Sequence, residues 1–470
     1  MLSRSYLTPG TKPPLLAYSP MLHARLFAET EKYRRSNFHS TKHSSDVTPE
    51  PWLDGNPALD RPLVVQFCAN DPHFLLEAAK KAAPHCDAVD LNLGCPQGIA
   101  RKGHYGAFLQ EEQGLIYDLI NTLHRELDVP VTAKIRILDT REATLEYAKN
   151  VLSAGASILT VHGRRREQKG HLTGLADWEA IRYLRDNLPP ETVIFANGNV
   201  LCHDDLERVL EATGADAVMT AEGNLSDPGI FAPPPAEDEE GREYWRGRDG
   251  RGGWRVDDAM RRYLDILHRY VAGVEPPARR PLFVPGDDTA WIDEVEAARE
   301  EGDGSPARKK RKREKKDVPA PNVNYAAMQP HMFHLLRHLV TVHTDVRDAL
   351  AHSPKGDLAA YEKVLTMVEA RVARGLLAYE AEGKTEGEEQ TSEEAPANDF
   401  EEELRGDSSA AALRRCKRPW WVAQPVIRPL PKEAVAKGSV TLGKKTAAAM
   451  GTDGEEAAKE AEKKAMSGAG

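Results

Sequence analysis

Residues 88–138 read AVDLNLGCPQGIARKGHYGAFLQEEQGLIYDLINTLHRELDVPVTAKIRIL, and this stretch decides the fold. Two apolar runs, Ala88–Gly94 and Val131–Leu138, predict buried strands, and the amphipathic segment Gly114–Leu127 between them predicts a helix. A strand, a helix and a second strand in this order predict a βα unit with parallel strands.

The same alternation extends outward over Leu15–Phe231 and fits either an open doubly wound sheet or a closed (β/α)8 barrel. Polar residues favour the barrel: Lys134 and Arg136 lie on the strand face opposite Ala133 and Ile135, and charged groups are useful at a barrel mouth. Seven strands are identifiable, at Leu15–Pro20, Leu63–Cys68, Ala88–Gly94, Val131–Leu138, Ser157–His162, Thr192–Ala196 and Ala217–Thr220. The Pro-rich stretch before Leu15 provides no eighth strand, so the first unit is missing.

Composition changes along the chain predict its domain organisation. We expect an irregular N-terminus over 1–14, a TIM-barrel catalytic domain over 15–231 and a Pro-, Gly- and charge-rich linker over 232–255. A small helical domain over 256–379 follows, with a basic low-complexity insert at 301–317, and then a mostly disordered tail over 380–470. Within that tail, Arg414–Pro429 reads as an ordered island.

Composition also limits the class of protein. The net charge of −10 argues at first against nucleic acid, but the acidic residues concentrate in two stretches of the expected tail. Five widely spaced cysteines form no metal-like cluster, and no apolar run is long enough to span a membrane. We therefore expect a metal-free, soluble monomer in the cytoplasm, with a nuclear location left open by the basic run Arg308–Lys316. That run could also bind RNA or be a solvated linker.

The most specific string is Leu91-Asn92-Leu93-Gly94-Cys95-Pro96-Gln97, followed by Gly106-Ala107-Phe108-Leu109. It places a thiol in a loop directly after a strand, where functional residues of α/β proteins gather. The alternative reading is a buried structural cysteine, since free cysteines are often buried.

The Asn-x-Gly-Cys-Pro string with its downstream Gly-Ala-x-Leu resembles the signature of the tRNA-dihydrouridine synthase family. The resemblance covers about half of the chain, from Leu15 to Phe231. The ending Ala221–Leu225, together with Arg415-Cys416-Lys417, resembles the eukaryotic branch that modifies positions 16 and 17 of the tRNA D-loop. Further matches are Tyr18–Met21, Val65–Phe67, Ala133–Arg136, Thr160–Arg164 and Asn197–Asn199.

This resemblance implies an oxidoreductase that reduces uridine in tRNA with FMN as cofactor and NADPH or NADH as reductant. It implies Cys95 as the proton donor, and Asn92 and Arg136 as substrate residues. The helical domain would bind tRNA, with Arg337, His338, His343 and Lys355 as candidate phosphate contacts. The cofactor-binding residues would be Gln66, Lys134, His162, Asn197, Gly198, Asn199, Glu222 and Gly223.

The chemistry of these residues agrees with such roles, although each has a plainer reading. Lys134 could stabilise an anionic reduced flavin, or its stem could simply extend to solvent from a strand end. His162 could line the cofactor or be a structural histidine. Asn197-Gly198 and Glu222-Gly223 follow the last two strands, where phosphate sites recur in barrels.

One departure from the family leaves other functions open. The family's first strand, which ends in Ala-Pro-Met, is not found, and its loss would leave an unpaired sheet edge. The alternatives are a flavin-free barrel that only binds RNA, and a flavin barrel that acts on free pyrimidines.

Overall fold

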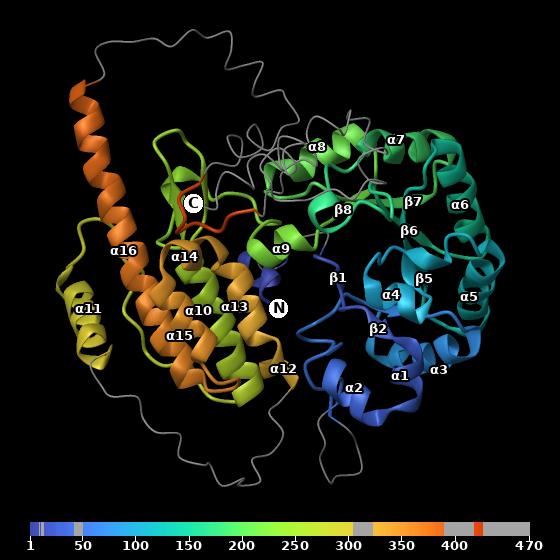
Figure 1. Cartoon of the computed structure of the whole chain (residues 1–470), viewed down its shortest axis with the longest axis horizontal. Coiled ribbons are helices and arrows are strands. Elements are labelled where there is room, and N and C mark those ends of the chain that lie inside the picture. Colours follow the sequence, from blue (N-terminus) through green and yellow to red (C-terminus); the bar gives the residue numbers. More distant parts are fainter. Residues whose placement is uncertain (9, 11–13, 42–49, 304–322, 390–417, 426–470) are drawn as a thin grey trace, which may run out of the picture.

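The computed structural model describes residues 1–8, 10, 14–41, 50–303, 323–389 and 418–425. Figure 1 shows two parts side by side: a curled parallel sheet with helices on its outer side, and a helical body around the long helix α16. Each part has its own hydrophobic core. The predicted basic run and Arg415-Cys416-Lys417 lie outside the described residues.

One parallel sheet organises the first part, in the order β1-β3-β4-β5-β6-β7-β8. Two short strands, β1 and β2, both pair with β3 at the first edge of the sheet. Tyr18 of β1 lies beside Val64, and Leu22 of β2 lies beside Phe67. The seven predicted strands are therefore present, and the predicted barrel class is confirmed. The strands are β1 Ala17–Tyr18, β2 Leu22–His23, β3 Leu63–Cys68, β4 Ala88–Asn92, β5 Val131–Arg136, β6 Ile158–His162, β7 Val193–Asn197 and β8 Ala217–Met219.

Helices between the strands cover the outside of the sheet (Figure 1). Their starts are encoded locally: the side chain of Asp71 caps α3, that of Thr140 caps α6 and that of Asp177 caps α7. The helices of this part are α1 Ala24–Glu29, α2 Glu31–Asn37, α3 Pro72–Ala82, α4 Gly98–Gly103, α5 Gln113–Glu126, α6 Arg141–Ser153, α7 Trp178–Asn187, α8 Asp204–Thr213 and α9 Glu222–Ser226.

The sheet does not close within the described residues, because β8 pairs with β7 and has no pairing with β1. The N-terminal turn η1 (Ser3–Tyr6) lies on this side, beside α9 in Figure 1. Arg4 donates to the carbonyl oxygens of Leu15 and Pro62, and Ser3 donates to the Asn224 side chain of α9 at 2.8 Å. A short 3-10 turn, held by side chains, thus occupies this side in place of a strand ladder.

The predicted linker over 232–255 contains regular structure in its second half. Strands β9 (Tyr244–Arg246) and β10 (Gly252–Trp254) form an antiparallel hairpin there. Tyr244 and Trp254 pack edge to face with ring centroids 5.3 Å apart. Aromatic residues explain why this hairpin forms, because each of them buries a large apolar area even where the segment is rich in glycine.

The second part is a helical body built on α10, α13–α16 and the described C-terminal residues 418–425 (Figure 1). Trp421 and Val422 belong to its core, and the backbone N–H of Val256 donates to the carbonyl oxygen of Trp421 at 3.1 Å. Residues 328–352 form three short helices in succession. The elements are α10 Val256–Ile266, a π-helical turn Leu267–Ala272, α11 Ala290–Asp303, α12 Val323–Ala326, α13 Met328–Leu335, α14 Arg337–Val342, α15 Thr344–His352 and α16 Leu358–Glu389.

A candidate active site at the mouth of the sheet

Most of the predicted site residues occupy the carboxyl ends of five neighbouring strands. The sheet register places Asn92 beside Lys134, Arg136 beside His162, and His162 beside Asn197. Gln66 lies one strand earlier, paired in register with Asp90. Parallel strands thus bring residues that are far apart in sequence to one edge, where barrel active sites lie.

Lys134 is the charged group at the centre of this edge. Its Nζ donates to Oδ1 of Asn197 at 3.0 Å, and Nδ2 of Asn197 donates to the carbonyl oxygen of Met219 at 2.8 Å. Burial, together with the neighbouring positive charge of Arg136, lowers the pKa of the Lys134 ammonium to about 8. Lys134 therefore remains mainly cationic near neutrality but titrates within reach of ordinary buffers.

A chain of hydrogen bonds connects the interior of the sheet with the Cys95 loop. Gln66 Nε2 donates to Oδ2 of Asp90 at 2.8 Å, and Asn92 Nδ2 donates to Oε1 of Gln66 at 2.8 Å. Oδ1 of Asn92 then accepts from the backbone N–H of Cys95 at 2.9 Å. Because a carboxylate only accepts, this chain fixes which end of each amide faces its neighbour.

Asp90 is the member of this chain that the sequence analysis did not select. It is fully buried, and Thr132 Oγ1 donates to its Oδ1 at 2.6 Å. Burial raises the pKa of the Asp90 carboxyl above its ordinary value, while its hydrogen bonds oppose that shift. A lone acidic residue inside an apolar strand, two positions before Asn92, is the sequence signal that could have identified it.

The Cys95 loop is held from several sides and leaves the thiol half-buried. The carbonyl oxygen of Cys95 accepts from the backbone N–H of Ala107 at 3.1 Å. Gly106 permits this approach: its φ is +66°, and a Cβ there would lie 2.9 Å from that oxygen. From the loop after β6, Lys169 Nζ donates to the carbonyl oxygen of Pro96 at 2.7 Å.

Arg136 lies at the same edge, where its guanidinium binds backbone carbonyls. Nε donates to Gly94 at 2.7 Å, and Nη1 donates to Arg165 at 2.9 Å and to Gln168 at 3.3 Å. Burial lowers the pKa of Arg136 to about 10. In this geometry Arg136 ties the Cys95 loop to the loop after β6, and its contact with substrate stays a prediction.

His162, Gly198 and Asn199 lie together between the ends of β6 and β7. Arg164 Nη1 lies 3.0 Å from Nε2 of His162, and Arg164 Nη2 donates to Oδ1 of Asn199 at 2.7 Å. Gly198 has a φ of +114°, and a Cβ there would lie 3.1 Å from Cδ2 of His162. Arg164 is a second contributor that sequence reasoning missed, although it ends the Thr160–Arg164 match.

Glu222 and Gly223 lie at the start of α9, directly after β8. Gly223 is buried, and a Cβ there would lie 2.4 Å from the carbonyl oxygen of Val200. The two predicted Gly-containing turns thus follow adjacent strands, as the sequence indicated. Their roles toward a phosphate stay predictions.

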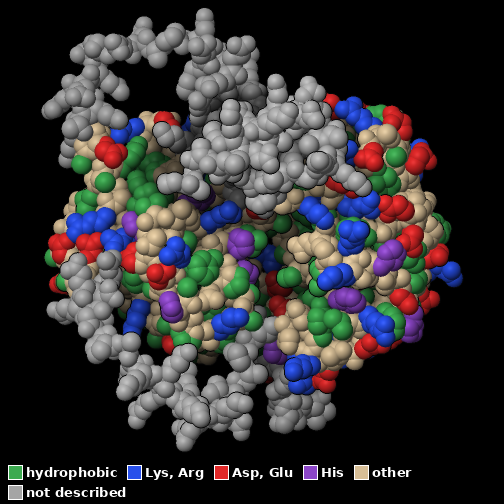
Figure 2. Space-filling model, viewed as in Figure 1, with side chains coloured by type: hydrophobic (Ala, Val, Ile, Leu, Met, Phe, Trp, Pro, Cys, Tyr) green, Lys and Arg blue, Asp and Glu red, His purple; other side chains and the backbone are tan. Residues whose placement is uncertain are grey.

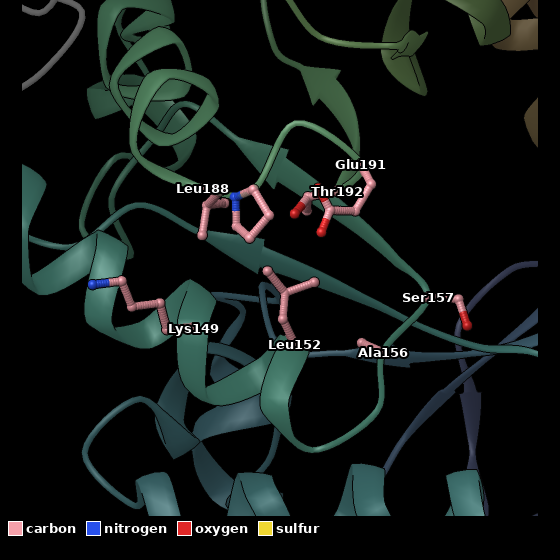
Figure 3. A pocket seen from close by; sticks show the side chains of 8 residues that line it. Lys149, Leu152, Ala156, Ser157, Leu188, Glu191 and Thr192 are labelled. Carbon is pink, nitrogen blue, oxygen red and sulfur yellow. The ribbon is translucent and has the colours of Figure 1, made fainter.

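A pocket of about 360 Å³ lies elsewhere, near the amino ends of β6 and β7 (Figure 3). Its lining includes Leu152, Leu188 and Pro189, and none of the predicted site residues. Polar side chains, among them Lys149, Glu191 and Thr192, line it as well, but this pocket lies away from the edge at which the predicted site residues gather, so the mouth is the better candidate site. Among the described residues, no cluster of His, Cys, Asp or Glu could hold a metal ion.

Comparison with known families adds to this geometry. A family model described as dihydrouridine synthase matches residues 6–246, which span the sheet, the Cys95 loop and α9. The chain belongs to the dihydrouridine synthase family. Within the described residues, no helix combines the length and the apolar character needed to cross a membrane.

The curated relatives of this dihydrouridine synthase family member include fungal and mammalian proteins. The chain is 48% identical over 336 residues to a tRNA-dihydrouridine(16/17) synthase of Saccharomyces cerevisiae, covering 72% of this chain and 63% of that protein. It is 40% identical to the protein of the same name in Schizosaccharomyces pombe, covering 90% of this chain and 84% of that one. A Mus musculus protein named as similar to this synthase is 48% identical over 49% of this chain and 45% of its own length.

Proposed function

We propose that this protein reduces uridine in the D-loop of tRNA to dihydrouridine, at positions 16 and 17, with FMN and NAD(P)H. The names of the two fungal relatives, which include NAD(P)(+), support the reaction class and the positions. The observation that carries the proposal is the backbone of Cys95, whose N–H donates to Asn92, the residue in register with Lys134 at the same edge.

The residues present fit a flavin mononucleotide. Gln66 and Asn92 offer amide groups, Lys134 offers a cation, and His162 offers a ring nitrogen at one edge, which suits the polar rim of an isoalloxazine ring. Gly198 packs so tightly that a Cβ there would lie 2.6 Å from Cβ of Ala176, so the turn beside His162 and Asn199 requires glycine at this position. When bound, FMN supplies hydride transfer from NAD(P)H to the pyrimidine.

The protein's own chemical contribution to this reaction is a proton. The Sγ of Cys95 would hold that proton and release it to C5 of the uracil ring as C6 is reduced. Asn92, which accepts from the backbone N–H groups of Gly94 and Cys95, sets the position of the loop. Lys134 would stabilise negative charge on the cofactor, since a cation in a largely buried site is poorly screened.

Basic side chains beside the Cys95 loop support an RNA substrate. Arg101 and Lys102 are exposed on α4, directly after the loop, and Lys169 is exposed on the loop that covers it. Figure 2 shows Lys and Arg side chains on both halves of the molecule, interspersed with acidic ones. Such contacts to phosphates would make tRNA binding weaken steeply with salt.

The test is to purify the full chain, record its flavin absorbance, and measure dihydrouridine in tRNA after incubation with NADPH or NADH. We expect a yellow protein that modifies tRNA transcripts at positions 16 and 17 and does not reduce free uracil or orotate. Reduction of the free bases would favour a pyrimidine dehydrogenase. A colourless protein that binds tRNA without modifying it, even after FMN is added, would favour a flavin-free RNA-binding barrel.

A further inference from the structure

Arg164 is an unassigned cation in contact with two predicted cofactor-binding residues. It lies two positions after His162, in the loop that follows β6. Its Nε and Nη2 donate to the carbonyl oxygen of Gly174 at 3.1 and 2.9 Å, and its Nη2 also donates to Oδ1 of Asn199 at 2.7 Å. Its Nη1 lies 3.0 Å from Nε2 of His162. Three separate partners therefore hold the guanidinium in one orientation.

The contact with His162 determines the protonation of that ring. A guanidinium carries only N–H donors, so Nε2 of His162 must be the acceptor and cannot carry a proton. A neutral imidazole then carries its proton on Nδ1. Burial lowers the pKa of His162 well below its ordinary value, and the positive charges of Lys134, Arg136 and Arg164 add to this shift.

The other ring nitrogen is available to a ligand. The described residues provide no hydrogen-bond partner for Nδ1 of His162, and this atom is not among the buried polar atoms that lack a partner. An N–H group in this position can donate to a carbonyl or phosphate oxygen, or to a ring nitrogen, of a bound molecule.

We propose that Arg164 is a positioning residue that holds His162 as the neutral Nδ1–H tautomer, so that the ring presents a hydrogen-bond donor to the cofactor. That the recipient is the cofactor rests on the proposed function. The tautomer of His162 does not rest on that function, because the contact between Arg164 and His162 is present in the protein without a ligand. The same guanidinium also fixes the positions of the Asn199 side chain and of the 163–176 loop. One residue therefore connects the β6 and β7 sides of the site.

Asn199 depends on this arrangement for its own geometry. It adopts a left-handed backbone with φ of +61°, which is uncommon outside glycine. Its Oδ1 also accepts from the backbone N–H of Ala176 at 3.0 Å, and its Nδ2 donates to the Ala176 carbonyl oxygen at 3.2 Å. Loss of Arg164 would leave these two bonds in place, so the variant is expected to fold.

The experiment measures the histidine tautomer directly in the full chain by long-range ¹H–¹⁵N correlation spectra of histidine-labelled protein. The His162 signal is assigned by its loss in His162→Gln. We expect a neutral ring at pH 7 with the proton on Nδ1. In Arg164→Met we expect a mixture of tautomers and a His162 pKa closer to the ordinary value, with FMN affinity reduced roughly tenfold.

Two further variants separate this role from a general loss of charge. Arg165→Met removes the neighbouring cation, whose Nη1 donates to Asp139 at the surface at 3.1 Å, and should leave the His162 spectrum unchanged. Arg164→Lys retains a donor and should restore part of the Nδ1–H population. A wild-type ring protonated on Nε2 or on both nitrogens at pH 7 overturns the proposal, as does an equal effect of Arg165→Met. These spectra need no tRNA, so absence of dihydrouridine formation with the expected tautomer would count against the proposed function alone.

Discussion

The ammonium group of Lys134 donates a 3.0 Å hydrogen bond to Oδ1 of Asn197, which joins the ends of β5 and β7 across the intervening strand β6. The bond crosses the concave side of the sheet, because both side chains project inward from alternate strands. It orients Asn197 with its Nδ2 toward β8, and it places a cation among Gln66, Asn92 and His162. The curvature of the sheet is therefore what assembles the site.

Lys134 should make cofactor binding depend on pH. Because its pKa is about 8, the ammonium is present below that pH and is lost as pH rises through it. We expect FMN affinity, measured by fluorescence quenching, to fall by roughly tenfold between about pH 7 and about pH 9. In Lys134→Met the affinity should be low throughout and nearly flat with pH. A wild-type profile as flat as that of the variant would place Lys134 outside the cofactor site.

Cys95→Ala should separate the two half-reactions. Removal of the thiol removes the proposed proton donor but none of the hydrogen bonds of the loop, which use backbone atoms. We expect FMN content and its reduction by NADPH to remain near wild type, while dihydrouridine formation in tRNA falls by at least about 100-fold. Cys68→Ala, a buried cysteine at the end of β3, is the control and should keep turnover. Normal turnover in Cys95→Ala would rule out this cysteine as the acid.

Gly198→Ala should damage the site through its backbone. A φ of +114° is unfavourable for alanine, and its Cβ would lie 2.6 Å from Cβ of Ala176. We expect a stability loss of about 1–3 kcal/mol and weaker FMN binding, measured by thermal unfolding and titration. Gly250→Ala, with φ of +75° and open space around it, should cost less and leave FMN binding unchanged. Equal effects of the two variants would mean that the close packing of Gly198 against Ala176 does not matter for stability or FMN binding.

Asp90 should matter through its hydrogen bonds more than through its charge. Asp90→Ala leaves Gln66 Nε2 and Thr132 Oγ1 without their acceptor in a buried site, at a cost of roughly 2–4 kcal/mol. Asp90→Asn can accept from Gln66 and donate to Thr132, so it should cost about 1 kcal/mol or less. Urea unfolding of both variants measures the difference. A loss in Asp90→Asn as large as that in Asp90→Ala would show that the carboxylate charge is required.

Trp421→Ala should show that residues 418–425 belong to the helical body. Trp421 is 7% exposed and packs on Trp245, with ring centroids 6.1 Å apart. Truncation of a buried tryptophan should cost roughly 3–5 kcal/mol, measured by chemical denaturation. Trp420→Ala, at a partly buried position beside it, should cost less. A negligible loss for Trp421 would mean that this segment is not part of the cooperative core.

The class of fold and the residues at its mouth could be predicted from the amino-acid sequence alone. Period-two apolar runs with polar ends indicated the strands and the positions of Gln66, Asn92, Lys134, His162 and Asn197. This was possible because strand alternation and parallel pairing are local rules: a residue at a strand end faces the same edge in every βα unit.

Which of these groups are in contact with one another could be seen only in the folded structure. The Asp90–Gln66–Asn92 chain, the Arg164–Asn199 contact and the engagement of Arg136 with backbone carbonyls all join positions on different strands or loops. The hairpin at 244–254 and the burial of Trp421 likewise depend on distant aromatic partners. Hydrogen-bond direction and side-chain packing are set by neighbours brought together in space, and a one-dimensional pattern contains no distance between them.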